Sequence, residues 1–134
     1  MLSWVIEDNL ARGQRPGYSG ERGRVVPQAE VDAWIAETKV FGIRTIICLL
    51  ADDQLHLYQQ LPGNLISYYL HAGFEVEHIP VCDYQQPPLS PNDLTKVWLA
   101  YQRLAKPVLV RCSAGVDRTG SAITHIRRQL ANTT

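Results

Sequence analysis

The stretch that decides the fold lies near the C-terminal end of the chain and runs Val108-Leu109-Val110-Arg111-Cys112-Ser113-Ala114-Gly115-Val116-Asp117-Arg118-Thr119-Gly120. Its first three residues are apolar and predict a short buried strand that ends just before Cys112. Small residues and glycine follow, and Arg118 opens a helix that we expect over Thr119 to Leu130. A strand, a tight loop and a helix N-terminus form a cradle for an anion, because backbone N–H groups point inward and the helix dipole adds positive charge.

Five residues separate Cys112 from Arg118, and this arrangement suits covalent chemistry on a bound phosphate. Arg118 can hold two phosphate oxygens at once, which a lysine cannot do. The positive field predicts a lowered pKa for the Cys112 thiol, so that its thiolate can attack phosphorus in line. We expect Thr119 to donate its hydroxyl to the sulfur, and Gly115 and Gly120 to supply the positive φ angles of a close turn. An inert buried thiol is the alternative for a lone cysteine.

The cradle as a whole is expected to bind phosphate through its main-chain amides. The predicted phosphate-binding residues are Ser113, Ala114, Gly115, Val116, Asp117 and Arg118. Asp117 has two interpretations: it holds a loop amide or pairs with a neighbouring arginine, or it belongs to the phosphate-binding pattern itself.

Composition and charge restrict the class of protein. The chain has 134 residues, 46% hydrophobic and 19% charged, which predicts one packed domain. A formal net charge of zero argues against a general polyanion binder. From Lys96 onward, however, seven residues are basic and one is acidic. Either this third of the chain faces an anionic ligand or the charges form a solvated helix face.

The cysteines and apolar stretches exclude several other classes. Three cysteines without a Cys-x-x-Cys pair, or a Cys/His pair at ligand spacing, predict neither a disulfide framework nor a metal site. We expect no cofactor. The longest apolar stretches are only as long as a strand, and the N-terminus lacks a secretory signal. We therefore expect a cytoplasmic protein without a membrane span.

Strand and helix patterns alternate along the chain. We expect an α/β fold with a central, mostly parallel twisted sheet flanked by helices. The expected strands are 4–6, 10–12, 43–50, 74–80 and 108–110, and the expected helices are 27–42, 52–60, 64–72, 91–106 and 119–130. In such sheets the chemistry lies at the carboxyl ends of the strands, which is where Cys112 stands.

The pattern Cys112-x5-Arg118-Thr119 resembles the signature loop Cys-x5-Arg-Ser/Thr of the cysteine-dependent protein tyrosine phosphatase superfamily. Chain length and layout resemble its small atypical dual-specificity members, through the N-terminal strand pair, the strand 44–50 and the segment 79–83. The resemblance implies a single phosphatase domain, 1–134, with a C-terminus shorter than usual for the family. It also implies hydrolysis of phosphate monoesters through a phosphocysteine intermediate, with protein phosphotyrosine, phosphoserine or phosphothreonine as the expected substrates.

This chemistry needs a proton donor, because an alkoxide or phenoxide leaves poorly unless it is protonated. Asp83 follows the predicted strand 74–80 in a loop with two prolines, 29 residues before Cys112. The general acid of the resembled family occupies such a loop, so we predict that role for Asp83. Asp93 is the rival, but it falls where a helix cap is expected. An ordinary turn aspartate is the alternative for Asp83.

The chain departs from the family pattern at Arg111, where the family usually has histidine. Arginine keeps a positive charge but lacks the size and acceptor nitrogen of imidazole, so we expect a looser loop and slower turnover. The ending Asp117-Arg118-Thr119-Gly120 resembles that of several phosphoinositide and bacterial phosphatases. Lipid-directed relatives, however, often carry lysines inside the loop, and this loop carries none.

Several other functions stay open. A phosphate-binding pseudophosphatase or interaction module fits Arg111 and the short C-terminus, and a phosphoinositide phosphatase or an RNA 5′-phosphatase is a substrate variant of the main hypothesis. An arsenate reductase is a further alternative with a Cys-x5-Arg loop. Those chains usually carry the loop near the N-terminus, whereas here it lies near the other end. The expected partner is a phosphorylated protein or a small phosphomonoester. We expect no nucleic acid, because no aromatic residues interleave with basic ones, and the sequence leaves the oligomeric state unknown.

The remaining candidates are weaker. Cys48 or Cys82 could trap oxidised Cys112 as a disulfide, although core or strand packing is the simpler explanation for both. Four arginines flank a Gly- and Arg-rich loop near the N-terminus and are candidates for substrate contact: Arg12, Arg15, Arg22 and Arg24.

Overall fold

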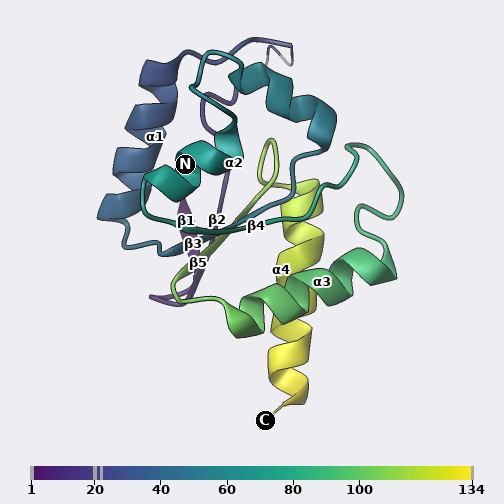
Figure 1. The fold of residues 1–134 in the computed structure, drawn as a ribbon. Helices are drawn as coiled ribbons and strands as arrows, with labels where there is room; N and C mark the ends of the chain where they lie inside the picture. The colour runs from purple at the N-terminus through teal and green to yellow at the C-terminus, as the bar shows by residue number, and fades with distance from the viewer. Residues whose placement is uncertain (1, 20, 22, 134) are drawn as a thin grey trace.

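The computed structural model describes residues 2–19, 21 and 23–133 and has helices on both faces of a five-stranded sheet (Figure 1). The strands follow the order β1-β2-β5-β3-β4 across the sheet. Only the β1–β2 pair is antiparallel, and the other three pairs are parallel. The predicted fold class is therefore confirmed. The strands are β1 (Ser3–Ile6), β2 (Leu10–Gly13), β3 (Thr45–Cys48), β4 (Glu75–His78) and β5 (Val108–Arg111).

The helices form two layers, one on each face of the sheet (Figure 1). One face carries α1 (Gln28–Val40), the 3₁₀ helix η1 (Asp52–Tyr58) and α2 (Leu65–His71). The opposite face carries α3 (Pro91–Arg103) and α4 (Asp117–Asn132). No helix of the described residues is both long enough and apolar enough to cross a bilayer.

The central position of β5 explains where the chemistry-bearing loop lies. β5 pairs with β2 on one side and β3 on the other, and every residue of β3 and β5 is buried. Side chains alternate between the two faces, so that Leu109 packs under α1 and α2 while Val108 and Val110 pack under α3 and α4. Cys112 therefore follows directly from the middle of the sheet.

Local capping fixes the start of α3 as the sequence predicts. The Ser90 hydroxyl accepts the Asp93 amide at 3.1 Å, the Asp93 carboxylate accepts the Ser90 amide at 3.2 Å, and Pro91 takes the first helical position.

Several predicted boundaries were wrong by a few residues. The strands predicted over 43–50 and 74–80 are shorter in the structure, where they are β3 and β4. Each pairs with its neighbouring strands over four residues only. α3 ends at Arg103, before Lys106. α4 begins at Asp117 rather than Thr119, because the Gly120 amide already donates to the Val116 carbonyl at 2.7 Å.

Candidate active site

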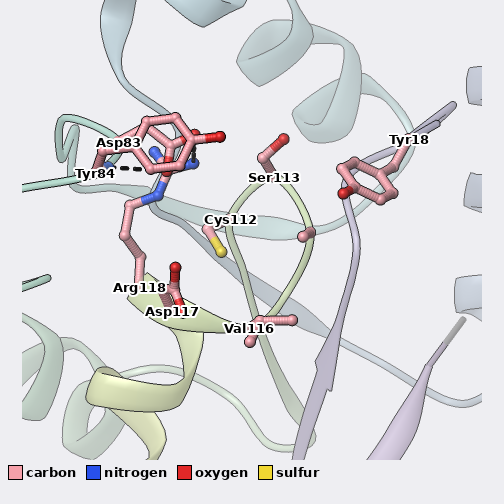
Figure 2. Close-up of a pocket in the computed structure, with 9 residues that line it drawn as sticks. Tyr18, Asp83, Tyr84, Cys112, Ser113, Val116, Asp117 and Arg118 are labelled. Carbon is pink, nitrogen blue, oxygen red and sulfur yellow. Dashed lines mark hydrogen bonds and ion pairs between the residues drawn. The ribbon is translucent and has the colours of Figure 1, made fainter. Parts of the chain in front are cut away.

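The loop that joins β5 to α4, together with Arg118 (residues 112–118, here called the phosphate loop), forms the floor of a pocket (Figure 2). A second segment, residues 82–89 after β4 (the acid loop), brings Asp83 and Tyr84 to the same pocket. The structure thus brings most of the predicted site residues together from segments far apart in the chain. The lining residues are Tyr18, Asp83, Tyr84, Cys112, Ser113, Ala114, Val116, Asp117 and Arg118.

Cys112 is buried at the base of the phosphate loop, with 2% of its surface exposed. Burial alone raises the pKa of its thiol, because the anion loses hydration. The nearby hydroxyl and amide of Thr119, the charge of Arg118 and the amide of Gly115 act in the opposite direction. These donors outweigh burial, so the pKa of Cys112 lies below its ordinary value.

Thr119 lies behind the pocket rather than in its wall, and it is fully buried. Its hydroxyl meets no partner at normal hydrogen-bond geometry in the described part of the chain. An oxygen of this kind is costly to bury without an acceptor. Thr119 lowers the pKa of the Cys112 thiol. This effect indicates that the Thr119 hydroxyl would donate to the sulfur once the thiol has become a thiolate.

One guanidinium nitrogen of Arg118 donates hydrogen bonds to three acceptors. Its Nη1 donates to the Val81 carbonyl at 2.8 Å, to Gln54 Oε1 at 2.9 Å and to the Leu49 carbonyl at 3.3 Å. The acceptors come from the ends of β3 and β4 and from η1, so three elements fix the plane of the guanidinium. Nη2 meets no acceptor at hydrogen-bond geometry among the described residues. It instead lies within ion-pair distance of Asp83, and Arg118 as a whole lines the pocket.

Asp83 reaches the pocket from the acid loop. Its Oδ2 lies 3.4 Å from Arg118 Nη2, within ion-pair distance, and its carboxylate also accepts the Tyr84 amide at 3.1 Å. Figure 2 shows Asp83 and Arg118 directed toward one another above Cys112. Asp93, the rival candidate, has its carboxylate engaged in the cap of α3.

The two glycines of the predicted cradle differ in role. Gly115 has φ +78°, and a Cβ there would lie 2.4 Å from the Gly13 carbonyl oxygen, so only glycine fits. The expectation of a positive φ at Gly120 was wrong. Gly120 lies in the first turn of α4, and a Cβ there would meet its nearest neighbour at 3.6 Å.

Comparison with known proteins was consistent with this geometry. Residues 23–129 match the family model described as Tc-R-P, polymorphic toxin system, DSP-PTPase phosphatase. The chain belongs to this family. The resemblance to the cysteine-dependent protein tyrosine phosphatase superfamily is thereby confirmed. A search of curated proteins found no match.

Solved structures share the fold of this chain at low identity. The core catalytic domain of the PP-IP phosphatase SIW14 from S. cerevisiae, solved with citrate, gives a TM-score of 0.61 at 18% identity, covering 95% of this chain and 64% of that one. A putative phosphatase (DUF442) from Shewanella putrefaciens CN-32 gives 0.58 at 21%, covering 98% and 70%. Tk-PTP in its active form gives 0.55 at 19%, covering 93% and 85%. The chain therefore spans about 64% of the SIW14 domain.

Arg111, the departure from the family pattern, lies on the other side of the sheet from the Cys112 side chain. It is fully buried, with its guanidinium carbon 5.1 Å from the ring centre of Tyr69 and 5.8 Å from that of Trp34. Its Nη1 donates to the Cys112 carbonyl at 3.4 Å. Arg111 therefore contacts the main chain of the phosphate loop and packs against aromatic faces, an arrangement that suits a guanidinium better than an ammonium.

Cys48 and Cys82 are free thiols, as is Cys112. Cys48 packs in the cluster under α1 and α2, whereas Cys112 packs in the cluster under α3 and α4. Cys82 is exposed, next to Asp83. Disulfide trapping of Cys112 stays a prediction.

The N-terminal arginines lie mainly against protein oxygens. Arg12 and Arg15 donate to the phosphate loop, which the sequence did not predict. Arg24 donates to the Gly17 carbonyl and pairs with Glu30. Arg22 lies outside the described residues. The only signal in the sequence was the density of arginine and glycine in this segment.

Proposed function

We propose that this DSP-PTPase phosphatase hydrolyses phosphate monoesters on proteins, at phosphotyrosine, phosphoserine or phosphothreonine, through a phosphocysteine intermediate. The proposal rests on three groups that meet at one pocket. They are the Cys112 thiol with its lowered pKa, the Arg118 guanidinium held by hydrogen bonds to the main chain, and the Asp83 carboxylate from a separate loop. Each supplies one requirement of the reaction, namely nucleophile, anion binding and proton transfer.

In the first half-reaction the Cys112 thiolate attacks phosphorus as the bond to the leaving oxygen breaks. Arg118 and the amides of residues 113–118 bind the phosphoryl oxygens, whose charge they match best in the transition state. Asp83, in its protonated form, gives its proton to the leaving oxygen. The products are the free alcohol or phenol and phosphocysteine.

In the second half-reaction a water molecule replaces the leaving group. The Asp83 carboxylate takes a proton from this water as its oxygen attacks phosphorus, and the bond from phosphorus to sulfur breaks. Inorganic phosphate leaves, and Cys112 returns as a thiolate stabilised by Thr119. One water is consumed for each monoester hydrolysed.

The walls of the pocket support a phosphorylated side chain as substrate. Tyr18 and Tyr84 line the pocket and are 38% and 70% exposed, and in Figure 2 they lie on opposite sides of the phosphate loop. Exposed aromatic rings at a pocket mouth favour contact with a flat or apolar organic group.

A phosphoinositide or inositol phosphate is the second candidate substrate, because SIW14, described as a PP-IP phosphatase, shares the fold. Such a substrate carries additional phosphates that need cations around the loop. Positions 113–117 offer no lysine or arginine, and Asp117 adds a negative charge at the pocket. The protein monoester is therefore the better-supported choice.

Turnover of an aryl phosphate at mildly acidic to neutral pH tests the proposal. We expect Cys112→Ser to reduce kcat by several orders of magnitude, as removal of the nucleophile does in other covalent hydrolases. Cys82→Ser is the matched control, because it removes an exposed thiol close to the pocket, and it should keep wild-type activity. Full activity in Cys112→Ser would exclude the mechanism. Binding of tungstate without turnover by the wild-type protein would instead identify a phosphate-binding module.

A panel of phosphorylated substrates then tests the substrate class. Phosphotyrosine, phosphoserine and phosphothreonine peptides should be hydrolysed with higher kcat/KM than inositol phosphates or phosphoinositides. The reverse order would assign the site to the polyphosphorylated class.

A further inference from the structure

Arg15 is a buried cation that the proposed reaction does not use. It follows β2, and only 3% of its surface is exposed. Within the described part of the chain it pairs with no carboxylate. Its guanidinium carbon lies 5.7 Å from the ring centre of Tyr18. Burying a charge without a counter-ion is costly, so its retention here needs a reason.

Arg15 holds a single residue of the phosphate loop at two points. Its backbone amide donates to the Ser113 carbonyl at 2.9 Å, and its Nε donates to the Ser113 hydroxyl at 3.0 Å. Its Nη1 donates to the Tyr58 hydroxyl at 3.2 Å, and that hydroxyl donates to the Pro16 carbonyl at 2.7 Å. The Nε and Nη1 atoms of one rigid guanidinium thus link the phosphate loop to η1.

Arg12 holds the same loop further along. Its Nη2 donates to the Gly115 carbonyl at 2.9 Å and approaches the Val116 carbonyl at 3.4 Å. Between the two arginines, the Gly13 carbonyl packs so closely on Gly115 that no Cβ would fit. Residues 12–15 therefore run along the outer side of the phosphate loop. We call Arg12 and Arg15 the outer brace.

The chemistry of the loop explains why such donors are needed. A loop that turns its N–H groups inward to bind an anion turns carbonyl oxygens outward. Buried carbonyls without a donor cost free energy and would favour a flipped peptide, which would aim an oxygen at the phosphate. The Arg12 guanidinium supplies donors to the outward carbonyls of Gly115 and Val116. The main-chain amide of Arg15 supplies the donor to the Ser113 carbonyl, and its guanidinium holds the Ser113 hydroxyl beside it.

We propose that Arg12 and Arg15 are positioning residues, which hold the peptide groups of the phosphate loop in the orientation that binds the phosphoryl group. The inference rests on the proposed function of the same pocket. Neither arginine lines that pocket, so both act through the loop. Because the two donors of Arg15 must reach Ser113 and Tyr58 together, a lysine keeps the charge but loses the geometry.

The test compares Arg12→Lys and Arg15→Lys with Arg24→Lys, which changes an arginine of the same segment that does not contact the loop. Three quantities are measured: kcat/KM for an aryl phosphate, the dissociation constant of tungstate, and stability to urea. For each brace variant we expect kcat/KM to fall by about tenfold to a hundredfold and tungstate binding to weaken, because small misplacements of binding groups have effects of this size. Arg24→Lys should match the wild type in both.

Tungstate affinity separates positioning from a purely structural role, since lost stability alone would leave the affinity of the folded protein unchanged. Ser113→Ala provides a second route if Arg15→Lys does not fold, because it removes the same hydrogen bond from the other side. Its effect and that of Arg15→Lys should be non-additive in the double variant.

The outcomes also separate this inference from the proposed function. Wild-type turnover together with unchanged kcat/KM and tungstate affinity in both brace variants would overturn the inference alone. If the wild-type protein hydrolysed no substrate but both brace variants bound tungstate more weakly than it does, the positioning role would be supported and the hydrolase proposal would be overturned.

Discussion

The phosphate loop and the acid loop face the same pocket but are built in opposite ways. The phosphate loop extends from the central strand of the sheet, and its Cys112 and Arg118 are buried. The outer brace, η1 and the ends of β3 and β4 all contribute hydrogen bonds to it. In the acid loop, by contrast, Cys82 and Tyr84 are exposed, and Asp83 meets Arg118 at the surface of the pocket.

The two constructions suit two tasks. Groups that stabilise the charge of a transition state work best when they are fixed before the substrate arrives. An acid that must meet a leaving oxygen, and later a water, can sit on a segment outside the core. Changes in the acid loop should therefore affect activity without stability, whereas changes in the phosphate loop should affect both.

After Cys112→Ser, the largest effect on activity is expected from Asp83→Asn. Loss of general acid catalysis should lower kcat by about 10²- to 10⁴-fold. Stability should change by less than about 1 kcal/mol, because the carboxylate is partly exposed and Arg118 keeps its three rear acceptors. Kinetics and urea unfolding measure the two quantities. Asp93→Asn is the matched control, and it should retain activity because its side chain caps α3. Equal losses of activity in both variants would remove Asp83 from its role.

Gly115→Ala should lower both stability and activity. A positive φ costs an alanine about 1–2 kcal/mol, and the new Cβ would collide with the Gly13 carbonyl. Displacement of the loop should reduce kcat/KM by about 10²-fold. Gly42→Ala is the control, since Gly42 has φ +88° with no atom near the new Cβ, so it incurs only the cost of the positive φ. A Gly115→Ala protein with wild-type turnover would contradict the fixed-loop account.

Thr119→Val should change the pH dependence more than the maximal rate. The hydroxyl lowers the pKa of Cys112, so its removal raises that pKa and reduces the thiolate fraction at low pH. The pH at which kcat/KM rises, and the pH at which inactivation by iodoacetamide becomes fast, should both increase. At still higher pH both rates should return to those of the wild type. Val and Thr have similar shapes, which limits the effect on packing. If neither pH changed, the hydroxyl would not act on the sulfur.

The sequence predicts the phosphate loop well because strand, loop and helix are contiguous there. The capping pattern beginning at Ser90 is equally local, and it correctly assigns Asp93 to the start of α3. The outer brace could not be predicted, because Arg15 and Ser113 are 98 positions apart and only the parallel pairing of β2 with β5 brings their segments together. The expectation of a positive φ at Gly120 was wrong because this residue lies in the first turn of α4, where the helical conformation sets a negative φ.

The most direct test of the mechanism is to stop the reaction with an aryl phosphate by denaturation at neutral to mildly alkaline pH within the first turnover, and to locate phosphate by mass spectrometry of the protein digested at the same pH. Covalent catalysis by Cys112 predicts up to one phosphate per chain, on the peptide that contains Cys112, and none in Cys112→Ser. Hydrolysis by the wild-type protein with phosphate found on another residue, together with undiminished turnover by Cys112→Ser, would contradict it.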